Sequence, residues 1–475
     1  MAGKQDVERG GEESRAPLLT AANEGQPSKK SSNEDRFMVY LSTFVAVSGS
    51  YAFGSCIGYS SPTQFAIRRD INLSLAEYSL FGSILNFGAI IGAITCGQMA
   101  DKVGRKGAMI VSSGFCTMGW LSIYIAEDAL LLDIGRLATG YGMGVFSYVV
   151  PVFISEIAPK DLRGALTTLH QLMIVTGVSV SFIVGTLVTW RDLALVGIVP
   201  CAALLVGLSV IPESPRWLAR QGKQREFEAS LRRLRGKNAD VSEEAAEIQD
   251  NIETLERLPK ARLLDLFQRR YQSSLMIAVG LMVFQQLGGI NGVSFYTSSI
   301  FEAAGFPSDV GTMIYAVLQV IITAVAATFM DKAGRKPLLV ISGSGLILGS
   351  LLIGSSFYVK EHGLASDAAP ALALSGVMVY IGSFSVGMGA IPWVVMSEIF
   401  PLNIKGAAGS FATLVNWSGS WACSYTFNFL MSWSTYGSFM LFAAVNALAV
   451  VFVIKVVPET KGRTLEQIQA EISST

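Results

Sequence analysis

A charged phrase occurs twice in this chain, and its repetition restricts the fold more than any other feature. The sequence DKVGRK at 101–106 returns as DKAGRK at 331–336. Two further phrases repeat in the same order: SEI at 155–157 returns at 397–399, and PES at 212–214 returns as PET at 458–460. Long apolar runs separate these phrases, and parallel repeats of membrane helices are one way in which two-halved secondary transporters are built. The chain is therefore a duplication, and its pattern indicates a carrier.

The composition is that of a membrane protein. Hydrophobic residues make up 51% of the chain and charged residues 15%, whereas charged residues make up about 25% of soluble domains. The formal net charge is zero, and the sequence has no broad basic patch that would indicate nucleic-acid binding. The cysteines stand inside apolar runs without paired spacing, so we expect buried thiols rather than disulfides or metal ligands: Cys56, Cys96, Cys116, Cys201 and Cys423.

The apolar runs have the length of membrane-spanning helices, which need roughly 20 residues. Residues 1–36 are polar and lack a signal-peptide core, which predicts a disordered cytosolic tail. About twelve apolar segments follow, approximately at 37–60, 76–99, 107–126, 131–155, 164–189, 192–211, 273–303, 308–330, 337–357, 370–397, 405–431 and 434–457.

Lysine and arginine fall mainly in the short connections on one side of these segments, and the positive-inside rule makes that side cytosolic. Both termini are then cytosolic. We therefore predict an all-α membrane protein with two six-helix halves and a cytosolic helical linker. Its parts are a tail at 1–36, a first half at 37–211, the linker at 212–272, a second half at 273–457 and a cytosolic tail at 458–475.

Five motifs resemble those of the sugar porter family of the major facilitator superfamily. In chain order they are GxxxDxxGRK at 97–106, GRxxxG at 135–140, PESPRW at 212–217, QQLxGIN at 285–291 and PETKG at 458–462. The resemblance extends from Phe37 to the carboxyl end, and it implies the major facilitator fold and alternating-access transport of a monosaccharide. GYSSP at 58–62 and VNW at 415–417 look most like the plant early-responsive-to-dehydration-six-like monosaccharide transporters.

A sugar site in a low-dielectric cavity must replace the hydrogen bonds that the sugar hydroxyls lose from water. Amide side chains donate and accept without burying a charge, and three of them lie close together in the QQLxGIN motif. A membrane-helix amide can also simply bond a neighbouring helix. By resemblance, the sugar ligands are Gln171, Gln285, Gln286, Asn291 and Asn416, with Trp393 beside the cavity.

Two further residues are candidates for contact with the sugar. Phe384 could stack on the apolar face of the sugar ring, although aromatic residues in membrane helices more often serve in packing. Gln319 stands where animal relatives often carry Asn, and its longer amide could still reach the sugar and shift the preference among hexoses.

Charged residues gather at the predicted cytosolic helix ends. The resemblance implies that they tie the two halves together while the site faces outward. The alternative is that they only anchor loops, since surface ion pairs contribute about 0–1 kcal/mol each. This gating set consists of Asp101, Arg105, Glu156, Arg163, Glu213, Arg216, Asp331, Arg335, Glu398, Lys405 and Glu459.

Arg136 stands well inside a predicted span, where a charge is costly, so we expect it to face the protein interior. In proton-coupled sugar porters a matching arginine partners an aspartate of the first helix, but the aligned position here holds Cys56. This difference favours facilitated diffusion. His170 remains as a candidate for proton coupling, with a neutral hydrogen-bonding or packing role as the alternative.

Other functions have less support in the sequence. It contains no nucleophile motif, no histidine pair with metal-ligand spacing and no GxxxxGK loop, so we expect no enzyme activity, cofactor or ATP. The expected substrate is glucose or another hexose such as fructose. A proton-coupled hexose symporter, a polyol or inositol carrier and a non-transporting sugar sensor are the alternatives. RAPLL at 15–19 resembles a dileucine sorting signal, and we expect the vacuolar membrane, with the plasma membrane as the alternative.

Overall fold

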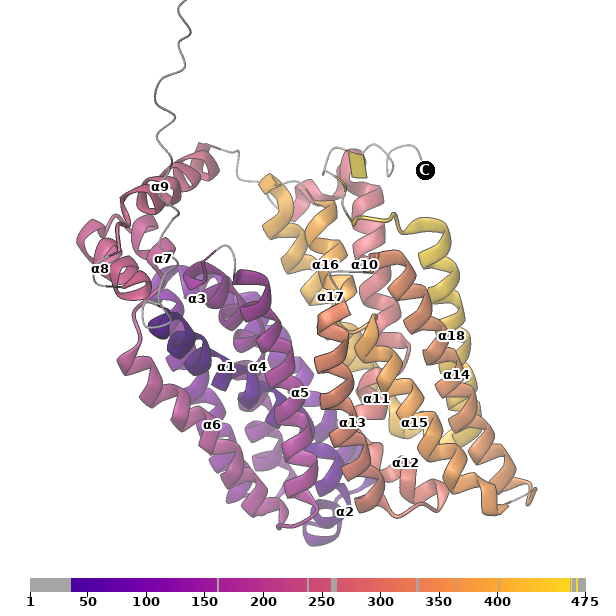
Figure 1. The fold of residues 1–475 in the computed structure, drawn as a ribbon. Helices are drawn as coiled ribbons and strands as arrows, with labels where there is room; N and C mark the ends of the chain where they lie inside the picture. Colours follow the sequence, from indigo (N-terminus) through magenta and orange to yellow (C-terminus); the bar gives the residue numbers. More distant parts are fainter. Residues whose placement is uncertain are drawn as a thin grey trace, which may run out of the picture.

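The computed structural model of the chain describes residues 36–159, 162–236, 239–257, 263–329, 333–364, 366–400, 402–461, 463 and 467–468. Every regular element in these ranges is a helix, which confirms the predicted all-helical class. In lipid, the backbone groups of a spanning segment can be satisfied only within the protein, and a helix satisfies them within the segment itself. Figure 1 shows the first half, in indigo to magenta, beside the second half, in salmon to yellow.

The first half consists of six helices: α1 (Phe37–Gly58), α2 (Ser60–Asp70), α3 (Leu75–Tyr124), α4 (Ala129–Ile157), α5 (Arg163–Gly185) and α6 (Trp190–Val210). Helix α3 contains two spans, because Gly104 inside it has φ 85° and ψ 170°. Before Gly104, positions 88 and 92 meet positions 140 and 144 of α4; after it, positions 112 and 119 meet positions 142 and 135. The chain therefore reverses at Gly104, at a left-handed φ that glycine adopts readily.

The second half contains broken spans. Its helices are α10 (Gln272–Leu287), α11 (Ile290–Phe295), α12 (Thr297–Ala304), α13 (Ser308–Phe329), α14 (Arg335–Glu361), α15 (Ala369–Val386), α16 (Ile391–Ile399), α17 (Leu402–Trp433) and α18 (Thr435–Val456), with 3-10 turns η1 (Leu263–Phe267), η2 (Arg269–Tyr271) and η3 (Ser366–Ala368). The predicted segment 273–303 is interrupted at Gly289, where φ is 104°. The predicted segment 370–397 is interrupted between α15 and α16.

Ten helices of the described ranges are long and apolar enough to cross a membrane. One of them, α3, supplies two of the predicted spans. Helix α17 is not among the ten, and its many Ser, Thr and Asn residues make it more polar than its neighbours. The cysteines are free and buried, as expected.

Three short helices, α7 (Pro215–Arg220), α8 (Gln224–Arg235) and α9 (Ser242–Arg257), lie between the halves in the sequence. Ser214 caps α7 by accepting a hydrogen bond from the Trp217 nitrogen at 3.2 Å, and Pro215 fits the first helical position. Trp217, Phe227 and Ile248 join the three helices in a small apolar core. We call the end of the molecule where they lie the linker end (Figure 1).

The halves meet through α1, α2, α3 and α5 on one side and α11, α12, α13 and α17 on the other. Helices α2 and α12 lie at the end of the molecule opposite the linker end (Figure 1). Aromatic rings cross the interface as well: Phe182 of α5 lies 5.2 Å from Tyr315 of α13, measured between ring centroids.

Close packing of α3 on α4 depends on glycine, and its loss should be measurable. A Cβ on Gly140 would lie 2.1 Å from the Leu85 carbonyl oxygen, so we expect Gly140→Val to destabilise the protein by about 1–3 kcal/mol or more. The measurement is the apparent unfolding temperature in detergent. Gly114→Val is the matched control, because a Cβ there meets no atom within 4 Å. Equal losses in the two variants would contradict this account of the packing.

Candidate functional site

Four predicted sugar ligands form one hydrogen-bonded group, the amide cluster: Gln285, Gln286, Asn291 and Asn416. The Asn416 Nδ2 atom donates to Gln285 Oε1 at 2.7 Å, and Gln286 Nε2 donates to the same oxygen at 3.4 Å. Asn291 donates in turn to Gln286. The cluster therefore joins α10 and α11 to α17, and it brings together four of the five amides that the sequence analysis grouped.

The break between α15 and α16 explains the orientation of Gln285. Pro392 has no N–H group, so it cannot donate to the Met388 carbonyl four residues earlier. The Trp393 nitrogen donates to Ala390 rather than to Gly389. Gln285 Nε2 instead donates to the carbonyl oxygens of Met388 at 2.5 Å and Gly389 at 3.1 Å. This contact between an amide and a broken helix was not predicted, although Pro392 in an apolar run was a usable signal.

The break between α10 and α11 is held in a similar way. The Tyr380 hydroxyl donates to the Gly288 carbonyl oxygen at 2.8 Å, and Asn446 Nδ2 donates to the same oxygen at 3.2 Å. Tyr380 and Asn446 are buried on α15 and α18. Both breaks thus lie beside the amide cluster with their carbonyl groups paired, and discontinuous helices of this kind form substrate sites in secondary transporters.

The remaining predicted ligands surround this group less closely. Trp393 is half-buried in the first turn of α16, and the Phe384 ring packs close to Gly389 at the break. Gln319 of α13 has a buried Oε1 atom without a hydrogen-bond partner among the described residues. Gln171 is exposed on α5, a helix that packs on α13. No hydrogen bond joins Gln171 or Gln319 to the amide cluster within the described ranges.

An aromatic contact across the interface was missed. Phe53 of α1 and Trp417 of α17 lie edge to face, with ring centroids 6.2 Å apart. Trp417 follows Asn416 directly, so its place beside the amide cluster could have been inferred from the VNW phrase. The pair brings the first half to the amide cluster of the second.

Arg136 is fully buried in α4, as expected. Its Nη1 atom donates to the Cys56 carbonyl oxygen at 2.8 Å and its Nη2 atom to Ser60 Oγ at 2.5 Å. The guanidinium also lies 5.0 Å from the Phe81 ring centroid and 5.7 Å from that of Tyr59, which are cation–π distances. No carboxylate of the described residues forms an ion pair with it.

Two titratable groups lie near this region. His170 Nδ1 and Ser50 Oγ are hydrogen-bonded at 2.7 Å, which joins α5 to α1. Asp133 is half-buried one helical turn before Arg136, and the sequence analysis did not single it out. An acidic residue near the start of an apolar segment was the available signal.

The charged phrase of the first half folds into a compact cluster at the linker end. Arg105 donates to both oxygens of Glu156 at 2.9 Å and to Asp101 Oδ1 at 3.2 Å. Ser214 Oγ donates to Glu156 Oε2 at 2.6 Å. Glu213 accepts from the backbone nitrogens of Lys106 at 3.1 Å and Ser214 at 2.7 Å. Burial raises the pKa of Glu213 above its usual value, and these N–H groups offset only part of that effect.

The repeated phrase folds in the same way in the second half. Arg335 Nη2 donates to Glu398 Oε1 at 3.2 Å, and Thr460 Oγ1 donates to Glu398 Oε2 at 2.5 Å. Glu459 accepts from the backbone nitrogens of Arg335 at 3.0 Å and Lys336 at 3.1 Å, at the start of α14. Burial would raise the pKa of Glu459, but backbone N–H groups outweigh burial and lower it below its usual value.

The hydrogen bonds and ion pairs found for these two clusters all lie within one half. Arg163, Arg216 and Lys405 form no ion pair with any residue that the structure describes. Asp331 lies outside the described residues. The expected connection between the halves through this gating set is therefore not formed in this conformation.

Uncharged groups connect the halves instead, in what we call the inter-half cluster. Its pairs are Ser61 with Ser298, Gln64 with Ser299, Asn86 with Ser424, and Ser79 with Asn428. The Asn86 amide donates at 2.9 Å and the Asn428 amide at 3.0 Å. These bonds join α2 to α12 and α3 to α17, from the end opposite the linker towards the middle of the protein.

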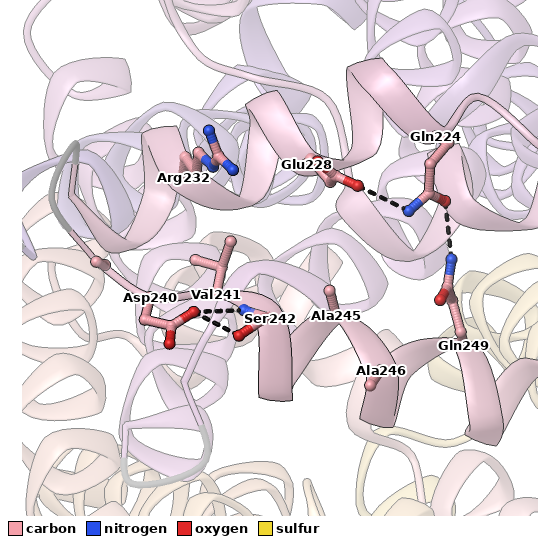
Figure 2. Close-up of a pocket in the computed structure, with 10 residues that line it drawn as sticks. Gln224, Glu228, Arg232, Asp240, Val241, Ser242, Ala245, Ala246 and Gln249 are labelled. Carbon is pink, nitrogen blue, oxygen red and sulfur yellow. Dashed lines mark hydrogen bonds between the residues drawn. The ribbon is translucent and has the colours of Figure 1, made fainter.

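A hollow of about 460 Å³ lies between α8 and α9 in the linker (Figure 2). Its polar side chains are largely bonded to one another: Gln224 bonds both Glu228 and Gln249, and Asp240 bonds Ser242. The hydrogen bonds from Ser242 lower the pKa of Asp240. The hollow lies outside the spanning helices, so the amide cluster remains the candidate site.

Comparisons with known proteins agree with this architecture. The family described as "Sugar (and other) transporter" matches residues 27–472. "Sugar transporter ERD6-like 7" of Arabidopsis thaliana is 71% identical over 437 residues, which cover 92% of this chain and 94% of that protein. "Sugar transporter ERD6-like 16" of the same plant is 56% identical over 472 residues, 98% of each chain.

Solved structures match along most of the chain. The inward open conformation of the xylose transporter XylE from E. coli has a TM-score of 0.78 and 26% identity, and covers 91% of this chain and 99% of that one. XylE bound to 6-bromo-6-deoxy-D-glucose, described as a proton:xylose symporter, has a TM-score of 0.74 and 27% identity, with the same coverage.

The inter-half cluster should hold the present conformation in place. Removing one such bond with Asn428→Ala should cost about 0.6 kcal/mol, which shifts a two-state population roughly threefold. Spin labels on cysteines at Lys102 and Gly406, both exposed near the linker end, would report the change as a gain of short distances. Asn251→Ala, in the linker, is the amide control. An unchanged distance distribution in Asn428→Ala would show that these bonds do not set the conformation.

Proposed function

This chain belongs to the sugar porter family of the major facilitator superfamily, with plant ERD6-like sugar transporters among its relatives. From that membership we propose that it carries a monosaccharide across a membrane by alternating access. The resemblance predicted from the five motifs is thereby confirmed. Proteins of this family are transporters, so the expectation that the chain is not an enzyme is confirmed as well.

The amide cluster is the observation that carries the proposal. It lies between two broken helices of one half and contacts the interface with the other half through Trp417 and Phe53. Both polar ends of Gln285 are occupied by protein partners, so Gln285 positions its neighbours. Gln286, Asn291 and Asn416 each keep donors or acceptors for a ligand, and the unpaired Gln319 Oε1 adds an acceptor.

Alternating access follows from the distribution of bonds between the halves. The inter-half cluster joins them at the end opposite the linker, whereas the charged clusters at the linker end stay within each half. Arg163, Arg216 and Lys405 form no ion pair with the described residues here, and we propose that in the opposite state they pair with carboxylates across the interface. Such a set need only differ between the two states, and it need not be strong in either.

Facilitated diffusion is the proposed mode. Both Nη atoms of Arg136 are bonded, one to a backbone carbonyl and one to a hydroxyl, and two aromatic rings lie beside the guanidinium, although its Nε atom has no partner among the described residues. Cys56 provides no carboxylate whose protonation could release this arginine. Symport with protons is the second candidate, favoured by the description of XylE as a proton:xylose symporter and by the presence of Asp133 and His170.

The proposed substrate is a hexose such as glucose or fructose, with a polyol as the alternative, because the same amides would bind either ring of hydroxyls. We place the protein in the vacuolar membrane with both termini in the cytosol. The linker end would then face the cytosol, and the present conformation would be open towards it.

Substitution of the amide cluster tests the site. We expect Gln286→Ala and Asn416→Ala to raise the KM for glucose exchange roughly 3- to 10-fold, the loss of about one neutral hydrogen bond each. The measurement is radiolabelled glucose exchange in proteoliposomes. Gln224→Ala, an amide of the linker, should leave the KM unchanged. Unaltered exchange by Gln286→Ala would exclude the amide cluster as the sugar site.

The mode of transport is tested by imposing a pH gradient without a sugar gradient. Facilitated diffusion predicts that glucose equilibrates without accumulating, and that a protonophore has no effect. Accumulation that collapses with the protonophore would overturn this mode. Asp133→Asn and His170→Gln would then identify the group that carries the proton, because only the variant lacking it would equilibrate without accumulation.

A further inference from the structure

An apolar groove of about 410 Å³ lies in the second half between α13, α14 and α15. Leu318 and Ile322 line it from α13, Ile341 from α14, and Val379 and Val386 from α15. Its volume is within the roughly 300–1,000 Å³ of small-molecule sites. The sugar site does not use this groove, and its lining offers too few polar groups to hold ordered water.

Two of the three helices that line the groove, α14 and α15, pack within the second half, whereas α13 also packs on α5 of the first half. Helix α14 packs on α15, α16, α18 and α12, all of the second half, and it lies with α18 on the side remote from the first half (Figure 1). Ile341 is 62% exposed. It stands six residues after Arg335, or roughly 9 Å along the helix at 1.5 Å per residue, within a span of mean hydropathy 2.0. At that depth the surroundings of the groove are lipid acyl chains.

The floor of the groove touches the helix break that orients Gln285. Ser342, a lining residue of α14, donates to the Ser383 carbonyl oxygen at 2.6 Å and accepts from the Met388 nitrogen at 2.9 Å. The Met388 carbonyl in turn accepts from Gln285. The Ser342 hydroxyl and the backbone of Met388 therefore connect the groove to the amide cluster.

We propose that this groove binds an acyl chain of a bilayer lipid, lodged between α13, α14 and α15 against the break between α15 and α16. The apolar lining, the membrane depth and the opening towards lipid all favour this occupant. A chain in the groove packs against the residues around Ser342 and so supports the break from the side opposite the amide cluster.

Photochemical labelling tests the proposal without relying on transport. The full-length protein is reconstituted with phosphatidylcholine that carries a diazirine in its acyl chain, irradiated, and analysed by peptide mass spectrometry. We expect adducts to be enriched at Ile322, Met378 and Val379 over Ile314 and Leu348, which are apolar and exposed outside the groove.

Filling the groove provides the decisive comparison. A side chain added at Gly382 points at the end of Ile322, whose Cδ1 atom would lie 2.9 Å from the new Cβ. Gly382→Leu should therefore lose the groove adducts and keep those at Ile314. Gly114→Leu, the same change where nothing lies within 4 Å, should keep both. Val379→Phe provides a second way to fill the groove if Gly382→Leu does not fold.

Four results would overturn the proposal. Equal labelling of the groove and of Leu348 would show no preferred acyl site, and adducts that persist in both filled variants would place the lipid elsewhere. Labelling of the groove by a water-soluble diazirine, or crosslinks there between two copies of the chain, would show a different occupant.

Discussion

Two backbone carbonyls inside the membrane, those of Met388 and Gly389, are left without helical partners because the chain breaks before Pro392. An unpaired carbonyl in an apolar environment is costly, so the structure around the break is organised to satisfy them. Gln285 donates to both, which fixes its amide plane and presents its oxygen to Asn416 and Gln286. The geometry of the amide cluster thus depends on a proline that has no N–H group to donate.

The duplication is visible in the interactions as well as in the sequence. Glu156 and Glu398 each accept from an arginine of the repeated phrase and from a hydroxyl, Ser214 or Thr460, that follows the sixth span of its half. Burial differs between the copies, since the side chain of Arg105 is 5% exposed and that of Arg335 is 16% exposed. The cluster of the first half is therefore the better shielded of the two, and it is the one that α7 covers.

The fold and part of the site could be predicted from the sequence, because they depend on local patterns. Apolar length gives the spans, and three amides within one motif indicate a common site. The contacts that complete the site depend on tertiary structure. The pairing of Gln285 with Met388 requires α10 to be in register with the break between α15 and α16, and that of Asn428 with Ser79 requires the halves to be docked. The hydropathy pattern predicts neither of these tertiary contacts, although the polar residues that form them stand out in apolar segments.

Charged groups stand at the linker end of the interface and uncharged amides and hydroxyls at the opposite end, and this difference affects how easily each end can open. Charged groups separate at little cost only where water can solvate them, since the penalty for an unpaired charge in a dry interior is several kcal/mol. The arginines and carboxylates stand at the linker end, at the ends of spanning helices, and their ion pairs among the described residues stay within each half. Amides and hydroxyls such as Asn86 and Ser424 hold the opposite end, and each such bond contributes little in a membrane. The end that the inter-half cluster closes can therefore open without exposing a charge to lipid. Ser342 links the proposed lipid groove to the break between α15 and α16, so a bilayer lipid would contact the backbone that orients the amide cluster.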